Sequence, residues 1–152
     1  MISWKEIRKI DSPIETVWKL FLDENIKIIM PKVESHEIIE KNEHEIGAKH
    51  RQTYREGKRL ETYTVETLDY VNEPHFKRKQ QRFVLGKAFE INLIYSLYKQ
   101  GESQTDFVYE GTNKGVNFIG HAMLKLGNEK SNKKVVDEFM DRVEKEALNT
   151  NR

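Results

Sequence analysis

The residues of this chain that could perform acid–base chemistry lie in two neighbouring stretches that read as β-strands. His50 and Tyr54 share the first stretch, and Glu61 follows early in the second. A histidine, with a reference pKa of about 6.5, suits a general base. A buried glutamate with a raised pKa suits an acid or a base. These three are the candidate catalytic residues, and an enolisable carbonyl compound is the substrate class they suit. Each also has a simpler role, with His50 as a hydrogen-bonded core residue and Glu61 as a solvated one.

Several other chemistries lack the residues they need. The sequence has no cysteine, so disulfides, thiolate catalysis and cysteine-type zinc or iron–sulfur sites are excluded. Its five histidines show no HExxH motif and no paired metal-ligand spacing, and no glycine-rich phosphate-binding motif occurs. We therefore expect no metal site and no cofactor.

The charge balance and hydropathy limit the class of protein. The chain has 26 lysines and arginines against 25 acidic residues, so it offers no electrostatic case for a nucleic-acid partner or a membrane surface. No apolar run approaches the length of a membrane span, and the charged N-terminal residues do not resemble a signal peptide. We expect a cytoplasmic protein of one domain, residues 1–152, without membrane insertion. The sequence does not indicate its oligomeric state.

The N-terminal part predicts a strand followed by two short helices. Residues 2–11 read as a strand with an apolar face. Ser12, Pro13 and Glu15 then form the pattern of a capping box with proline at the first helical position. A second short helix is expected over residues 25–30, where it ends before a proline.

The rest of the chain predicts strands and one closing helix. Glycine- and asparagine-containing turns separate six strands, at 33–41, 48–55, 60–71, 75–84, 88–99 and 105–112. A helix over about 121–148 closes the chain. Segregated helices and strands joined by short turns indicate an α+β fold, an antiparallel sheet with helices on one face.

This order of elements resembles the START/Bet v 1-like superfamily, also called the SRPBCC or polyketide cyclase/dehydrase-like group. The residues that carry the resemblance are Ser12, Pro13, Val17, Trp18, Gly47, Pro74 and the helix through Phe139 to Ala147. The resemblance implies a helix-grip fold, in which a curved antiparallel sheet of about seven strands wraps around the C-terminal helix. It also implies a cavity between them for apolar or amphipathic small molecules. No catalytic motif is shared by all members.

Strand periodicity indicates which side chains face that cavity. In residues 48–55 the cations share one face and belong in water, so His50, Gln52 and Tyr54 should point inward. A four-residue turn at 56–59 would pair Gln52 with Tyr63 and His50 with Val65, which places all of them on one side of the sheet.

The next hairpin adds a second inward row. Alternation in residues 88–99 turns Ile91, Leu93 and Tyr95 toward the core. A three-residue turn after this strand would align Phe107 and Tyr109 with that row. A two-residue turn would instead bring the opposite face of the last strand inward.

The closing helix loses its apolar stripe in its first half. Val136 and Phe139 belong to an apolar face, whereas Asn128 and Asn132 occupy the same face one to two turns earlier. Buried in a dry core, each such polar group would cost on the order of 1–3 kcal/mol. Either the helix breaks at Gly127, or its polar half covers a hydrated cavity, which the resemblance favours.

These arguments give a set of predicted ligand-binding residues. They are His50, Gln52, Tyr54, Tyr63, Val65, Ile91, Leu93, Tyr95, Phe107, Tyr109, Asn128, Asn132, Val136 and Phe139. The leading hypothesis is a non-enzymatic protein that binds one small hydrophobic or amphipathic molecule, such as a lipid, isoprenoid or aromatic metabolite. The first alternative is a polyketide cyclase/dehydrase-like enzyme that uses the acid–base residues above. The second is an adaptor that binds protein or RNA through the cationic segment 75–82, for which a solvated strand edge is the simpler interpretation.

Overall fold

The computed structural model describes residues 1–41, 43–117 and 129–149. The strands of this part form one antiparallel sheet in the order β1-β7-β6-β5-β4-β3-β2. Their bounds are β1 (Ile2–Ile10), β2 (Val33–Glu40), β3 (Lys49–Glu56), β4 (Arg59–Asn72), β5 (Phe76–Leu85), β6 (Phe89–Gly101) and β7 (Gln104–Gly115). The predicted order of strands is confirmed, and their boundaries agree with the predicted ones to within three residues.

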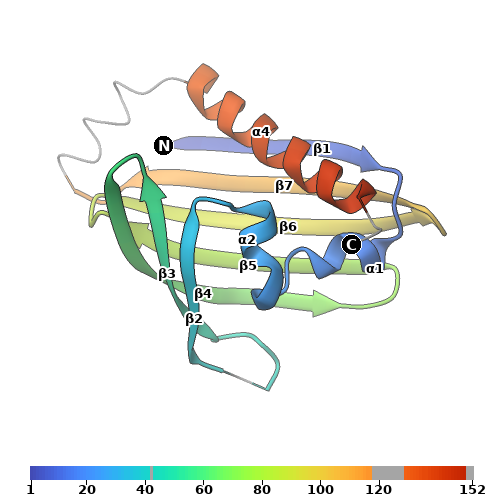
Figure 1. The fold of residues 1–152 in the computed structure, drawn as a ribbon, viewed down its shortest axis with the longest axis horizontal. Coiled ribbons are helices and arrows are strands. Elements are labelled where there is room, and N and C mark those ends of the chain that lie inside the picture. The colour runs from blue at the N-terminus through green and yellow to red at the C-terminus, as the bar shows by residue number, and fades with distance from the viewer. Residues whose placement is uncertain (42, 118–128, 150–152) are drawn as a thin grey trace.

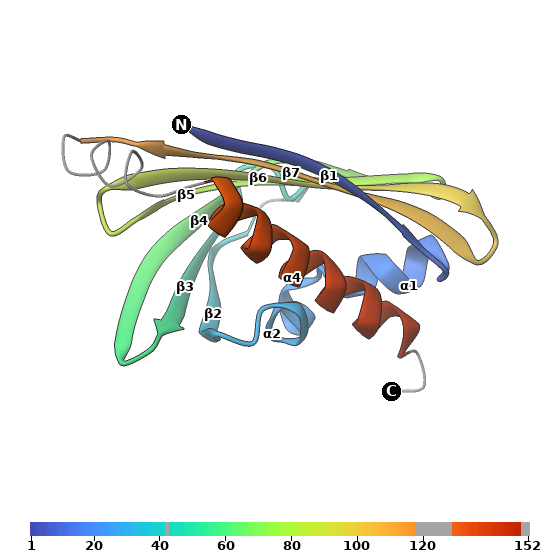
Figure 2. The same cartoon turned by 90° about the horizontal axis from the view of Figure 1, so that it is seen from above.

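The helices lie on one side of this sheet. They are α1 (Ile14–Lys19), the 3-10 turn η1 (Asp23–Asn25), α2 (Ile26–Ile29) and α4 (Glu129–Leu148). Figure 1 shows α4 crossing the sheet obliquely, with α1 and α2 on the same side. Figure 2 shows the sheet curving toward that side, so that the edge strand β2 lies beside α2, with β3 on the far side of β2. We call the face of the sheet that carries α4 the inner face.

The core forms where α4 meets the inner face. Tyr95 is paired with Tyr109, and Leu97 with Phe107, across β6 and β7. These four side chains are buried together with the apolar face of α4, which consists of Val136, Met140, Val143 and Ala147. The prediction that Phe107 and Tyr109 join the inward row of β6 is therefore confirmed. The predicted three-residue turn is wrong, because the turn has two residues, 102–103, and a bulge between Lys99 and Gly101 restores the inward orientation.

The β3–β4 hairpin also has the predicted register. His50 is paired with Val65 and Gln52 with Tyr63, as predicted, although Glu56 and Arg59 are also paired, so the turn has two residues rather than four. Gly57 in this turn has φ +60, which is a conformation that glycine adopts at little cost. The inward orientation of His50 and Gln52 follows from this register.

The capping box predicted at Ser12 is wrong. The N-cap of α1 is Pro13, with no side-chain cap, and the N–H groups of Thr16 and Val17 donate to the Pro13 carbonyl. The Ser12 hydroxyl instead donates to the Ala147 carbonyl near the end of α4, at 3.3 Å. Glu15 forms an ion pair with Lys77 at 2.9 Å rather than returning to the cap. Packing of the α1 start against α4 thus overrides the local capping pattern.

The interpretation of segment 75–82 as a solvated edge is also wrong. This segment lies mainly in β5, which is a central strand. Its register pairs Lys77 with Leu97 and Lys79 with Tyr95, so both lysines point inward and are buried. On the outer face, Arg78 is in an ion pair with Asp69. The cations therefore do not gather on one exposed surface.

Two features expected from the sequence lie outside the described residues. Asn128 and the course of the chain through Gly127 fall within residues 118–128. From Glu129 onward the helix is continuous, and its apolar face meets the sheet as predicted. None of the described helices is both long and apolar enough to cross a membrane.

Candidate functional site

A cavity of about 390 Å³ lies between the inner face of the sheet, α2 and α4. Its volume is within the range of small-molecule sites. The apolar part of its wall comes from β2, β4, β5, β6 and α4. It includes Val33, Val65, Leu85, Ile91, Leu93 and Val136. Aliphatic residues of an inner sheet face would ordinarily pack directly on a helix. Here the curvature of the sheet holds α4 away from them.

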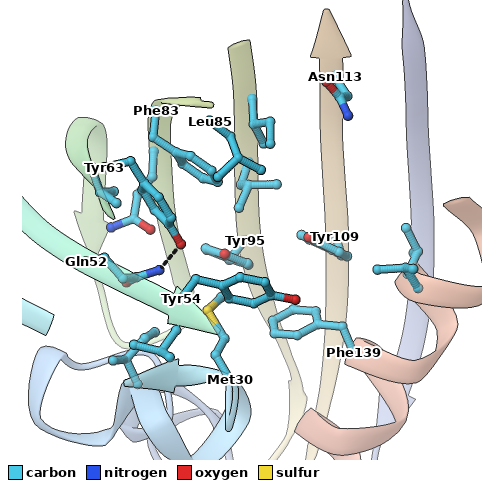
Figure 3. Close-up of a pocket in the computed structure, with 18 of the residues that line it drawn as sticks. Met30, Gln52, Tyr54, Tyr63, Phe83, Leu85, Tyr95, Tyr109, Asn113 and Phe139 are labelled. Atoms are coloured by element: carbon cyan, nitrogen blue, oxygen red, sulfur yellow. Dashed lines mark hydrogen bonds between the residues drawn. The ribbon is translucent and has the colours of Figure 1, made fainter. Parts of the chain in front are cut away.

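Aromatic rings form a large share of the cavity wall. On one side Tyr63 of β4 stacks on Phe83 of β5, with ring centroids 4.6 Å apart. On the other side Tyr109 contacts Phe139 of α4 at 4.8 Å, and Tyr95 stacks on Tyr109 at 5.5 Å. Figure 3 shows these rings around the cavity, together with Met30 and with Tyr54, which extends from β3. Such a wall suits a ligand with flat or conjugated apolar parts.

A connected set of polar side chains begins at the cavity wall. Gln52 Nε2 donates to the Tyr63 hydroxyl at 2.7 Å, and the other end of this amide contacts His36 Nδ1 at 2.8 Å. His36 Nε2 lies 2.9 Å from Asp23, whose second carboxylate oxygen lies 3.1 Å from His50 Nε2. The residues come from β4, β3, β2 and η1, so this network ties η1 to the sheet.

The proton positions in this network depend on the Gln52 amide. With its nitrogen toward Tyr63, the amide oxygen accepts from His36 Nδ1–H. The second nitrogen of His36 then donates to Asp23, and His36 carries a positive charge. With the amide turned over, a neutral His36 satisfies the same contacts. The carboxylate of Asp23 is the acceptor in both arrangements.

Two charged groups, Lys79 at the cavity wall and Asp23 behind it, have shifted pKa values. Burial raises the pKa of Asp23. The hydrogen bonds from His36 and His50, together with the charge of Lys79, outweigh it and hold that pKa well below its usual range. Burial lowers the pKa of Lys79, against the opposing effect of Asp23. The Lys79 ammonium donates to the Phe21 carbonyl at 3.0 Å and lies 4.0 Å from Asp23. Lys79 is thus a buried cation at the edge of the cavity.

The tyrosines of the wall are neutral hydroxyl groups. Burial raises the pKa of Tyr63, Tyr95 and Tyr109 above the usual value for tyrosine. The Tyr95 hydroxyl is buried and has no hydrogen-bond partner among the described residues. The same is true of Trp4 Nε1 and Asn113 Oδ1, which also belong to cavity-lining side chains. Polar atoms of this kind are ordinarily paired, and here a ligand or water is the available partner.

The network also contains the one group of potential metal ligands found in the described part of the chain. Asp23, His36 and His50 offer ligand atoms within 4.8 Å of one another, and their types suit zinc or ferrous iron. However, the imidazole rings are stacked 4.7 Å apart, and each contacts a different oxygen of Asp23. The Lys79 ammonium also lies beside this carboxylate. This is the geometry of hydrogen-bonded pairs rather than of side chains converging on one ion.

Most of the predicted ligand-binding residues line the cavity. They are Gln52, Tyr54, Tyr63, Val65, Ile91, Leu93, Tyr95, Tyr109, Asn132, Val136 and Phe139. Phe107 is buried in the core below it, and His50 is buried against Asp23 behind the wall. Asn128 is outside the described residues.

The three candidate catalytic residues are not gathered at the cavity. Tyr54 lines it, but His50 and Glu61 do not. Glu61 is paired with Tyr54 across the hairpin, and its carboxylate binds Arg59 at 2.7 Å near the strand end. Of the histidines that the structure describes, His36 is the one at the cavity wall.

Sequence reasoning missed a further group of lining residues. They are Trp4, Ile26, Met30, Val33, His36, Lys79, Gln81, Phe83, Leu85, Asn113 and Val135. Those on β5 could have been found by extending the inward row of β6 through the short turn at 86–88. That pairing sets Lys79 opposite Tyr95 and Phe83 opposite Ile91. His36 could have been found in the same way, as the residue opposite Gln52.

Comparisons with known proteins support the fold. No protein-family model and no curated protein sequence matches this chain. Solved structures do match over nearly its whole length. A START superfamily protein from Mycobacterium smegmatis is 11% identical with a TM-score of 0.75, covering 97% of each chain. The ZhuI aromatase/cyclase from Streptomyces sp. R1128 is 15% identical with a TM-score of 0.68, covering 99% of this chain and 96% of that chain.

A third similar structure contains small aromatic molecules. It is norcoclaurine synthase from Thalictrum flavum, solved in complex with dopamine and hydroxybenzaldehyde. It is 14% identical with a TM-score of 0.65, covering 99% of this chain and 88% of that chain. At these identities the similarity concerns the fold. The chain has the helix-grip fold of START/Bet v 1-like (SRPBCC) proteins, and the resemblance inferred from the sequence is confirmed at that level.

Proposed function

We propose that this protein binds one small amphipathic molecule in the cavity between the inner sheet face and α4, and that it does so in the cytoplasm. The observation that carries the proposal is the cavity itself, about 390 Å³ with an apolar and aromatic wall and a few convergent polar groups. The unpartnered polar atoms of Trp4, Tyr95 and Asn113 support it, because a bound molecule would satisfy them. The similar structures include a synthase with small aromatic molecules bound.

Native mass spectrometry of protein purified from its own host tests this proposal. We expect the folded protein to exceed its sequence mass by one small molecule, which unfolding releases. Ile91→Trp, which fills the cavity from β6, should lose that molecule while keeping the circular-dichroism spectrum. Ile94→Trp adds the same side chain to the opposite face of β6 and should retain it. A wild-type protein with no adduct and no binding of 1-anilinonaphthalene-8-sulfonate would overturn the proposal.

A second candidate function is acid–base catalysis on a carbonyl compound. One observation favours it, the His36–Asp23 pair at 2.9 Å, in which a carboxylate orients an imidazole at the cavity wall. His36 and Tyr63 would have to take the place of His50 and Glu61, which do not line the cavity, whereas Tyr54 does. Turnover of a model β-keto compound that is lost in His36→Gln, with binding retained, would support this second function.

A further inference from the structure

A buried cation is an unusual component of an apolar cavity, and Lys79 is one. It lies on the inner face of the central strand β5, and its side chain is 8% exposed. Burying an ammonium group is costly unless nearby groups compensate its charge and hydrogen bonds. The contacts of Lys79 therefore indicate what the cavity is built to receive.

The compensation within the protein is incomplete. Asp23 is the nearest carboxylate, but its oxygens already accept from His36 and His50, and it lies 4.0 Å from the Lys79 ammonium. One N–H of the ammonium goes to the Phe21 carbonyl, which is neutral. Consistent with this, burial lowers the pKa of Lys79 more than the neighbouring carboxylates raise it. An additional negative charge at the cavity side of Lys79 would therefore be stabilised.

A second hydrogen-bond donor lies beside this cation. Lys79 and Tyr95 are directly paired across β5 and β6, so their side chains leave the same face of the sheet as nearest neighbours. The Tyr95 hydroxyl is buried and has no partner among the described residues. Both side chains line the cavity. An oxyanion at this wall would accept from a cation and a neutral hydroxyl, two donors that complement each other.

The rest of the cavity suits an aromatic body for such a molecule. Tyr63 and Phe83 are stacked on one side, and Tyr109 and Phe139 are in contact on the other. Figure 3 shows Tyr63 and Phe139 on opposite sides of Tyr95. A volume of about 390 Å³ lies toward the lower end of the range for ligand sites, which favours a compact ring system over a two-chain lipid.

We propose that the ligand is an aromatic carboxylate whose acidic group binds to Lys79 and Tyr95. This inference rests on the proposed function and names the class of molecule for the same cavity. The ring system lies between the two pairs of aromatic side chains. Lys79 sets the preference for an anion, since no other lysine or arginine of the described residues lines the cavity.

Two probes of similar shape and different charge test this proposal. Isothermal titration calorimetry would compare 2-naphthoate with 2-naphthalenemethanol, which carries the same ring and a neutral hydroxymethyl group. Wild type should bind the naphthoate about tenfold more tightly or better. Lys79→Met should remove that preference while changing the affinity for the alcohol by less than about threefold. Tyr95→Phe should weaken naphthoate binding to a smaller extent.

Lys77→Met is the matched control. Lys77 lies two residues away on the same face of β5 and is also buried, but it binds Glu15 and does not line the cavity. This variant should keep the preference for the naphthoate. If Lys79→Met fails to fold, the ratio of the two probe affinities in wild type is the test. Equal affinities, or a higher affinity for the alcohol, would overturn the proposal.

The outcomes separate this inference from the proposed function. Binding of both probes with the same selectivity in wild type and Lys79→Met overturns the anion assignment and leaves ligand binding intact. If neither probe binds but native mass spectrometry shows an adduct, the assignment of an aromatic carboxylate is overturned and the proposed function stands. Binding of neither probe, no adduct and no binding of 1-anilinonaphthalene-8-sulfonate would together overturn both.

Discussion

The indole ring of Trp4 occupies the space above Gly111, its direct partner across β1 and β7. A Cβ atom built on Gly111 would lie 2.2 Å from Cζ2 of this ring. The close approach lets the indole lie against the sheet, where it lines the cavity and meets Tyr109 edge-on at 5.7 Å. The wall at this end of the cavity therefore depends on the absence of a side chain at position 111.

Gly111→Ala should displace Trp4 from this position. Because the added methyl group would overlap the ring, we expect a loss of about 1–3 kcal/mol in the free energy of unfolding, measured by urea denaturation. The displaced indole should also alter the cavity and weaken binding of 1-anilinonaphthalene-8-sulfonate.

Gly101→Ala is the matched control for this prediction. A Cβ atom at Gly101 would meet nothing within 4 Å, so its effect on stability should stay within about 0.5 kcal/mol. Equal stabilities of the two alanine variants would contradict the role given to Gly111.

The parts of the fold that the sequence predicted well have dense, alternating patterns. Residues 88–99 alternate aliphatic and aromatic side chains with mostly polar ones, so a one-residue slip would expose the whole row. The hairpin register that pairs Gln52 with Tyr63 followed from the turn length alone. Together with the helical periodicity of α4, these local rules were enough to identify eleven of the lining residues named under the candidate site.

The parts that the sequence did not predict depend on contacts between distant segments. Lys79 looked like a surface residue because cations usually lie in water, whereas its strand is central and its face points inward. Asp23 meets two histidines only because η1 is placed against β2 and β3 by the tertiary fold. Similarly, the hydroxyl of Ser12 binds α4, more than 100 positions later in the chain. No local sequence pattern predicts these contacts.

The ionisation of Asp23 should contribute to stability. Its folded pKa is held below the unfolded value despite burial, because His36, His50 and Lys79 stabilise the carboxylate. A depressed carboxyl pKa gives stability that is present above the unfolded pKa of about 3.9 and is lost as pH falls. The stability difference between wild type and Asp23→Asn should therefore shrink below about pH 4.

Urea unfolding of both proteins over a series of pH values measures this difference. Glu102→Gln, which removes an exposed carboxylate from the β6–β7 turn, is the control for general charge effects. A wild-type advantage over Asp23→Asn that persists unchanged to about pH 2 would rule out linkage through this carboxylate.

Removing single hydroxyl groups from the wall should affect binding more than stability. Tyr63→Phe deprives Gln52 Nε2 of its acceptor at 2.7 Å, and we expect a cost of about 1 kcal/mol. Tyr109→Phe should cost about the same or less. Both should change the affinity for 1-anilinonaphthalene-8-sulfonate in a fluorescence titration. Tyr98→Phe, at an exposed position of β6, should change neither quantity. Unchanged affinity in both cavity variants would place these hydroxyls outside the binding site.

Ser12→Ala tests the connection between the start of α1 and the end of α4. The variant loses a buried hydrogen bond to the Ala147 carbonyl, which should cost about 0.5–1.5 kcal/mol. Because the Ser12 hydroxyl does not cap α1, the loss should loosen the C-terminal end of α4, which amide hydrogen exchange near Ala147 would show. Faster exchange confined to the first turn of α1 would instead support a capping role.

Asn132 tests the hypothesis that the polar half of α4 covers the cavity. The side chain is half-buried, lines the cavity and lies about one helical turn before Val136. Asn132→Leu replaces a weak helix former by a strong one, so stability should stay level or rise by about 0.5 kcal/mol. The larger apolar side chain should occupy part of the cavity and lower the affinity for 1-anilinonaphthalene-8-sulfonate.

Asn132→Ala separates loss of the amide from loss of cavity space, because it removes the amide without filling the cavity. A loss of affinity in both variants means that the amide contacts the ligand, and a loss only in the leucine variant means that space decides. Lys134→Leu, on an exposed face of α4, controls for probe binding to a surface leucine. If both Asn132 variants bind the probe as wild type does, α4 does not cover the site at this position, and the ligand lies nearer to β3–β5.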